Sequence, residues 1–225
     1  MDTGFPAWSR DEEHDGDQDR GHADWMVPEG ATNDSPRILY THGGGYEFYS
    51  PQDVYRPTTS RLAAASGMPV LAIDFRLCPE YRHPAQLEDA VQAFQWIAEN
   101  GPFGQGRARK IFLAGDSAGG GLALALALRL RDSPIVSASV AGITVVSPQT
   151  DMTCSGESYT SRRWKKGGGP QCDPIFIGED PAGESMPQIA KLLGEQGEEG
   201  SYALTDPALS VLHAELHKLP PTQIH

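Results

Sequence analysis

The chain has 225 residues, of which 39% are apolar and 21% are charged, so it is long and apolar enough for one folded domain. Its net charge of −12 lies mainly in two segments, residues 1–24 with a net charge of −6 and residues 178–199 with −5. Since an acidic chain repels phosphate backbones, we expect no nucleic-acid partner.

No apolar stretch reaches the roughly 20 residues that span a bilayer, so we expect no integral membrane segment. The N-terminus lacks the basic flank and apolar run of a secretory signal, which indicates a cytoplasmic protein. The three cysteines are widely spaced and form neither a metal-ligand pattern nor a disulfide framework. The sequence carries no signal for an oligomeric state.

The predicted elements begin after an acidic tail, residues 1–24, which shows no periodic apolar pattern and is expected to be disordered. Residues 25–225 are expected to form the folded core. Residues 37–41 (RILYT) predict a strand. Residues 53–66 predict a helix that the following glycine caps. Residues 68–75 (MPVLAIDF) predict a short strand that is buried on both faces.

Helices and strands continue to alternate along the middle of the chain. Residues 87–98 carry apolar side chains at helical spacing, and Asn-Gly-Pro ends that helix. Residues 110–114 predict a strand, residues 117–131 a helix and residues 139–146 a strand. This alternation predicts an α/β fold with a mostly parallel central sheet and helices on both faces.

The last third of the chain breaks the pattern. Residues 151–205 are rich in Gly, Glu and Ser and predict an irregular insertion or a lid. Residues 206–216 predict a helix, with Asp206 as its N-cap. Residues 220–225 predict the first part of another strand, so we expect the sheet to be incomplete at its C-terminal strands.

A Gly-Asp-Ser-Ala-Gly motif at residues 115–119 stands between a predicted strand and a predicted helix. In this context the motif predicts a nucleophile elbow, a sharp turn that holds Ser117 in strained backbone geometry. Such a turn needs positions without side-chain bulk beside the serine, and Gly115 and Gly119 supply them. The order of strand, motif and helix favours the elbow over a plain glycine-rich turn.

A His-Gly-Gly-Gly motif at residues 42–45 follows the first predicted strand. Consecutive glycines leave backbone N–H groups free to point at an oxyanion. The position of the motif, two strand–helix units before the serine, favours an oxyanion hole over a flexible turn. We expect its donors to be the N–H groups of Gly43, Gly44 and Ala118, and we expect His42 to shape the loop rather than to act as a base.

Four motifs stand in a fixed order: HGGG at residues 42–45, DFRLCPE at 74–80, PAQLEDA at 84–90 and GDSAGG at 115–120. Together they resemble the hormone-sensitive-lipase-like esterases of the α/β-hydrolase fold, from about residue 25 to residue 225. The resemblance implies hydrolysis of a small-molecule carboxylic ester by acyl transfer to Ser117, with no cofactor and no metal.

The same resemblance suggests how the site is supported. Arg76 and Glu80 are expected to brace a loop near the site, with a surface ion pair as the alternative for both. Asp116 stands beside the nucleophile and is expected to brace a neighbouring loop. Together with His42, Gly115 and Gly119, these residues form the predicted support of the site.

A serine nucleophile needs a base, and the base needs an acid that orients it. The resemblance puts both after residue 225, because in this fold they follow the serine along the chain. His213 and His217 also follow Ser117, but we expect them at the surface near the predicted helix over residues 206–216. We therefore expect an esterase abbreviated at both ends, with weak or no turnover.

Two other functions are compatible with the sequence. One is a catalytically dead α/β-hydrolase that acts as a small-ligand binding protein, for which receptors on this fold are a precedent. The other is a fragment without a function of its own. Formation of an acyl-enzyme at Ser117 distinguishes the esterase from both.

Overall fold

The computed structural model describes residues 22–225 except 109, 136–137, 158–162, 165–172 and 178–201. Its central element is a six-stranded sheet in the order β1-β3-β2-β6-β7-β10, in which β1 is antiparallel to β3 and all other neighbours are parallel. The strands are β1 (Ala23–Met26), β2 (Arg37–Thr41), β3 (Val70–Ile73), β6 (Lys110–Asp116), β7 (Ser139–Val146) and β10 (Thr222–Ile224).

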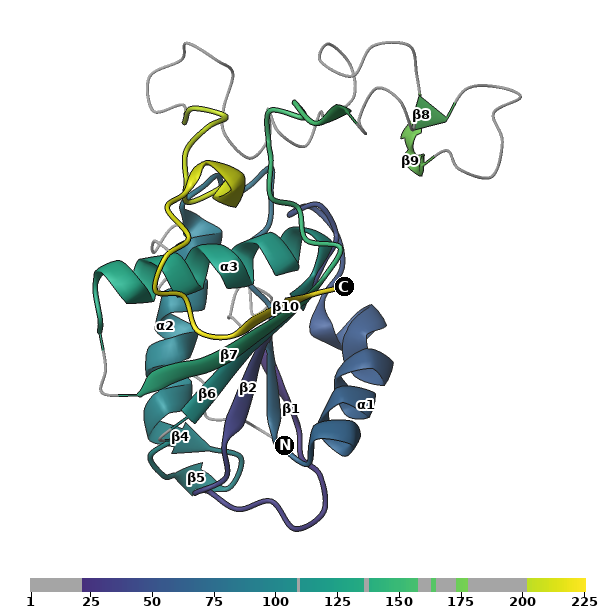
Figure 1. The fold of residues 1–225 in the computed structure, drawn as a ribbon. Coiled ribbons are helices and arrows are strands. Elements are labelled where there is room, and N and C mark those ends of the chain that lie inside the picture. Colours follow the sequence, from purple (N-terminus) through teal and green to yellow (C-terminus); the bar gives the residue numbers. More distant parts are fainter. Residues whose placement is uncertain (1–21, 109, 136–137, 158–162, 165–172, 178–201) are drawn as a thin grey trace.

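Three α-helices in the described part of the chain cover the sheet. They are α1 (Arg56–Ser66), α2 (Ala85–Glu99) and α3 (Ser117–Asp132). α2 and α3 lie on one face and α1 lies on the other (Figure 1). The predicted mostly parallel sheet with helices on both faces is therefore confirmed. No helix in the described part of the chain is both long enough and apolar enough to cross a bilayer.

Short elements complete the described residues. A π-helical turn (Pro51–Tyr55) leads into α1, and β4 (Asn100–Gly101) pairs with β5 (Gly104–Gln105) after α2. β8 (Arg163–Trp164) and β9 (Asp173–Ile177) form a separate two-stranded pair. The predicted helix over residues 53–66 is thus a π-helical turn followed by an α-helix. Gly67 caps that helix in the left-handed conformation with φ +67°.

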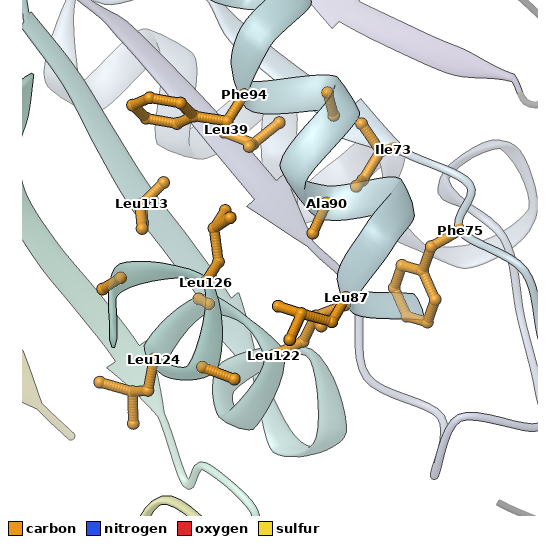
Figure 2. Packing of buried hydrophobic residues seen from close by; sticks show 14 of the residues in the cluster. Leu39, Ile73, Phe75, Leu87, Ala90, Phe94, Leu113, Leu122, Leu124 and Leu126 are labelled. Atoms are coloured by element: carbon orange, nitrogen blue, oxygen red, sulfur yellow. The ribbon is translucent and has the colours of Figure 1, made fainter. Parts of the chain in front are cut away.

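Side chains that alternate along the strands build two hydrophobic clusters. Leu39 of β2 points toward α2 and α3, while Ile38 and Tyr40 join the cluster under α1. On the α2–α3 side, Phe94 and Leu126 pack with their neighbours over the strands (Figure 2). All residues of β3 are fully buried, as predicted for a strand covered on both faces.

The strand order reverses direction between β2 and β6. From β2 the chain crosses through α1 to β3 on one side, whereas from β6 it crosses through α3 to β7 on the other side. In open α/β sheets the ligand site lies at such a reversal, outside the carboxyl ends of the strands. Thr41 and Gly115 are register partners at these two ends, so the topology brings the two glycine-rich motifs together.

The predicted helix over residues 206–216 is wrong, and a single 3₁₀ turn, Val211–His213, takes its place. Ser210 is buried, and its hydroxyl accepts a hydrogen bond from the N–H of Met152 at 2.8 Å. The N–H of Leu212 donates to a carbonyl in the chain segment after β7 at 3.0 Å. These hydrogen bonds to residues far away in the sequence take the place of helical hydrogen bonds, so the segment does not form the helix that its local sequence favours.

The structure describes only part of the predicted acidic tail and of the predicted insertion. β1 begins at Ala23, so the folded part starts two residues before the predicted boundary. Asp24 accepts a hydrogen bond from Nε of Arg56 at 2.8 Å and thereby ties β1 to α1. The rest of the acidic tail, residues 1–21, and most of the predicted insertion over residues 151–205 lie outside the described residues.

Arg37 is a cation with no exposed surface at the start of β2. Its guanidinium donates to the carbonyls of Asn100 at 2.7 Å and Gly106 at 2.5 Å, and also to those of Ile97 and Asn33. Burial lowers the pKa of Arg37, while the nearby charges of acidic residues oppose that shift. One side chain therefore joins β2 to the end of α2 and to the β4–β5 hairpin.

Replacing Arg37 with methionine tests this junction. We expect the Arg37→Met variant to lose about 3 kcal/mol of unfolding free energy, because the carbonyls lose a charged donor. Urea unfolding followed by circular dichroism measures the loss. The matched control is Arg61→Met on the exposed side of α1, for which we expect a change within about 0.5 kcal/mol. Equal losses in the two variants would contradict the interpretation.

Candidate active site

Ser117 lies at the sharp turn between β6 and α3. Its φ of +50° falls in the left-handed region that residues other than glycine seldom adopt, so the predicted strained turn is confirmed. The side chain is exposed, whereas Ala118 behind it is fully buried. The carbonyl of Ser117 accepts the N–H of Gln149 at 2.8 Å, which ties the turn to the loop after β7. The serine is thus presented outside the carboxyl end of the sheet.

The turn depends on a close approach of two backbones. A Cβ at Gly119 would overlap the carbonyl oxygens of Thr41 and His42, and one at Gly115 would lie 2.6 Å from the carbonyl oxygen of Thr41. The hydroxyl of Thr41 donates to the carbonyl of Gly119 at 2.7 Å. The first turn of α3 therefore packs directly against the end of β2, as the glycines predict.

The next two glycines of α3 face a different part of the chain. A Cβ at Gly121 would overlap the carbonyl oxygen of Gln149, and one at Gly120 would lie 3.0 Å from Cβ of Pro148. Both glycines thus make room for the loop after β7.

The His-Gly-Gly-Gly loop leaves the end of β2 and turns at its second and third glycines. Gly44 has φ +124° and Gly45 has φ +65°. The carbonyl of Gly44 accepts the N–H groups of Glu47 at 3.1 Å and Phe48 at 3.0 Å, which closes the turn. A side chain on Gly44 would overlap the carbonyl of Phe48.

The carboxylate of Asp116 braces this loop. Its Oδ1 accepts the N–H of Gly43 at 3.1 Å and the hydroxyl of Tyr40 at 2.7 Å, and its Oδ2 accepts the hydroxyl of Tyr55 at 2.9 Å. The bracing role predicted for Asp116 agrees with this geometry. The N–H of Gly43, which was predicted as an oxyanion donor, is thus already bonded to Asp116 in this structure.

His42 is nearly fully buried, with 1% of its surface exposed. Its Nδ1 donates to the carbonyl of Gly43 at 2.7 Å, and its ring stacks on Phe75 with centroids 4.4 Å apart. Burial lowers the pKa of His42, which keeps the imidazole neutral. These contacts agree with a residue that shapes the loop rather than with a base at Ser117.

Arg76 and Glu80 differ in their surroundings. Arg76 forms an ion pair with the buried carboxylate of Asp89 at 2.7 Å, and its backbone N–H donates to the same carboxylate at 2.8 Å. Asp89 lies in the first half of α2, so this pair fixes the loop after β3. Glu80 is exposed and has no hydrogen bond or ion pair with any residue that the structure describes, so its bracing role stays a prediction.

Two histidines follow Ser117 in the described residues before the last strand. Nε2 of His213 lies 3.8 Å from Oδ1 of Asp151, and Nδ1 of His217 lies 3.8 Å from a carboxylate oxygen of Glu215. The carboxylate of Asp151 is already held by the backbone and hydroxyls of the turn that follows it. Among the described residues, none forms a hydrogen bond with the Ser117 hydroxyl.

Comparison with known proteins adds a family and named relatives. A sequence model described as alpha/beta hydrolase fold matches residues 38–225. An acetyl-hydrolase of Streptomyces hygroscopicus is 43% identical over 148 residues, which cover 64% of this chain and 46% of that protein. An ethyl acetate hydrolase of Pseudomonas putida is 35% identical over 117 residues, which cover 52% of this chain and 36% of that protein. The chain spans less than half the length of these curated relatives.

Solved esterase structures have the same arrangement of strands and helices. The structure of EstE5 soaked with p-nitrophenyl butyrate is 32% identical, has a TM-score of 0.71, and is matched over 90% of this chain and 60% of its own. An esterase from the bacterial hormone-sensitive lipase family is 34% identical with a TM-score of 0.68, over the same shares of the two chains.

The close approach of α3 to β2 is tested by adding one methyl group at Gly119. We expect Gly119→Ala to lose about 1–3 kcal/mol of unfolding free energy, because the new Cβ meets rigid backbone carbonyls. Gly120→Ala is the control, since it adds the same group in the same helical turn, where the nearest atoms are Cβ and Cα of Pro148 at 3.0 and 3.1 Å and no atom overlaps. We expect its change to stay within about 1 kcal/mol. Thermal unfolding of both variants decides, and a Gly119→Ala variant as stable as the wild type would contradict the packing argument.

Proposed function

The chain belongs to the α/β-hydrolase fold family, and on that premise we propose that it carries the acyl-transfer site of a serine carboxylic-ester hydrolase. One observation carries the proposal: Ser117 is exposed at a strained strand-to-helix turn beside a glycine loop. Strain of this kind persists only where surrounding contacts over-determine the backbone, and it clusters at functional sites. The esterase names of the relatives supply the substrate class.

The proposed reaction begins with attack of the Ser117 hydroxyl oxygen on the ester carbonyl. The carbonyl π electrons move onto the oxygen, and they return as the C–O bond to the alcohol breaks, so that the alcohol leaves with the proton given up by Ser117. Water then adds to the acyl carbonyl, the bond to the Ser117 oxygen breaks, and the serine regains a proton as the acid leaves. The tetrahedral intermediate carries its negative charge on the former carbonyl oxygen. Each N–H that stabilises this oxygen is worth about 3 kcal/mol.

We assign the oxyanion hole to the N–H groups of Gly44, Gly45 and Ala118. Gly43 is replaced in this set by Gly45, because the Gly43 N–H already donates to Asp116. Ala118 is at the start of α3, where backbone N–H groups have no partner within the helix. The positive end of the helix dipole favours negative charge at the same place.

Proton transfer limits the proposed reaction in this chain. A serine hydroxyl is a weak nucleophile without a hydrogen-bonded base, and no described residue accepts its proton. In a serine protease without its triad, the oxyanion hole and substrate binding still leave a rate about 10³-fold above water. We therefore expect slow but measurable ester hydrolysis.

The test uses p-nitrophenyl acetate and p-nitrophenyl butyrate, because the named relatives and the soaked esterase point to short acyl chains. We expect slow release of p-nitrophenol and covalent labelling of the chain by a fluorophosphonate. Both signals should disappear in Ser117→Ala and persist in Ser139→Ala, which changes an exposed serine at the opposite end of the sheet.

A different result would favour the second candidate function. If the chain binds a short ester or its acid while Ser117 is never labelled, the site is that of a catalytically dead binding protein. The absence of a base bonded to Ser117 in the described residues is the observation that favours this alternative. Labelling that survives in Ser117→Ala would contradict both assignments of the site.

A further inference from the structure

The Asp116 carboxylate joins three parts of the fold that meet beside the nucleophile. Tyr40 comes from β2, Tyr55 from the π-helical turn before α1, and Gly43 from the glycine loop. Their donor atoms lie 2.7, 2.9 and 3.1 Å from the carboxylate oxygens. Of these residues, only Asp116 and Gly43 belong to the two glycine-rich motifs.

We propose that Tyr40, Tyr55 and Asp116 form a positioning clamp that sets the distance between Ser117 and the oxyanion donors. This inference rests on the proposed ester hydrolysis. Asp116 directly precedes Ser117, and Gly43 directly precedes Gly44. The Gly43–Asp116 hydrogen bond therefore links the nucleophile to the loop through one residue on each side.

The space at Gly43 supports the clamp independently of the hydrogen bonds. A Cβ at Gly43 would overlap Oδ2 of Asp116 and would lie 2.8 Å from the Tyr55 hydroxyl oxygen. Gly43 does not have the positive φ of Gly44 and Gly45. The first glycine of the motif is thus required by contact with the clamp, whereas the next two have positive φ, and Gly44 also has no room for a side chain beside Phe48.

The two tyrosines also disperse the negative charge of the Asp116 carboxylate. A carboxylate close to a developing oxyanion repels it, and hydrogen-bond donors on both of its oxygens disperse that charge. Burial, followed by the charge and hydrogen bond of Asp116, raises the pKa of both Tyr40 and Tyr55. Their hydroxyls consequently remain protonated donors at any pH where the serine could act.

The surrounding rings hold the tyrosines in place. The centroid of the Tyr55 ring is 6.0 Å from that of Tyr40 and 5.4 Å from that of His42. Tyr55 ends the π-helical turn Pro51–Tyr55, an irregularity of a kind that is frequent at functional sites. The turn directs the Tyr55 hydroxyl at Asp116, across the start of the glycine loop.

The experiment measures kcat and KM for p-nitrophenyl butyrate in Tyr40→Phe, Tyr55→Phe, Asp116→Asn and the Tyr55→Phe/Asp116→Asn double variant. We expect Asp116→Asn to lower kcat about 100-fold and each phenylalanine variant about 10-fold, with KM within about twofold. The double variant should lose little more than Asp116→Asn alone, because both changes break one unit.

Tyr49→Phe is the matched control. Its ring lies 6.5 Å from that of Tyr55, and its hydroxyl is outside the clamp. We expect its kcat to stay within about twofold of the wild type. Tyr55→Phe keeps the shape of the side chain, so it tests the clamp even if Asp116→Asn fails to fold. An unchanged kcat in folded Tyr55→Phe and Tyr40→Phe would overturn the proposal.

Hydrogen exchange separates failure of the clamp from failure of the proposed function. If the wild type hydrolyses no ester and resists the fluorophosphonate, the proposed function is wrong, and exchange at residues 43–45 decides on the clamp. Exchange at least about tenfold faster in Tyr55→Phe than in Tyr49→Phe would support a clamp on the loop. Equal exchange in the two variants would overturn it.

Discussion

The site depends on how closely the first turn of α3 approaches the end of β2. At Gly119 there is no room for even a methyl group beside the carbonyls of Thr41 and His42. Two residues before Gly119, Ser117 has its left-handed conformation at the end of β6, and the glycine loop starts at the same end of β2. The strained serine and the glycine loop therefore meet where the two backbones pack most closely.

The sheet topology explains why the constraint falls at this point. β2 and β6 are parallel neighbours, and the helices that follow them lie on opposite faces of the sheet. The chain therefore leaves the two neighbouring carboxyl ends in different directions. Asp116, at the end of β6, accepts a hydrogen bond from the loop after β2 and thereby joins the two ends. The Arg76–Asp89 ion pair does the same for the loop after β3. Charged side chains thus hold the loops that the strands only bring together.

Much of the fold follows from the sequence, because apolar runs and glycine-rich turns are local signals. The strand over residues 37–41 and the serine turn are found where the pattern predicts them. The prediction of a helix over residues 206–216 was wrong because Ser210 is bonded to Met152, a residue far away in the sequence. The bond between Gly43 and Asp116 could not be predicted for a similar reason, because no spacing rule shows that a motif glycine is already bonded. Tyr55 carries no sequence signal at all.

The most direct test is a crystal structure of the chain with Ser117 phosphonylated, since the phosphonyl oxygen occupies the position of the oxyanion. The account predicts this oxygen within about 3 Å of the N–H groups of Gly44, Gly45 and Ala118. It also predicts that the Gly43 N–H remains bonded to Asp116. A phosphonyl oxygen bonded to the Gly43 N–H, with Asp116 released from the loop, would contradict it.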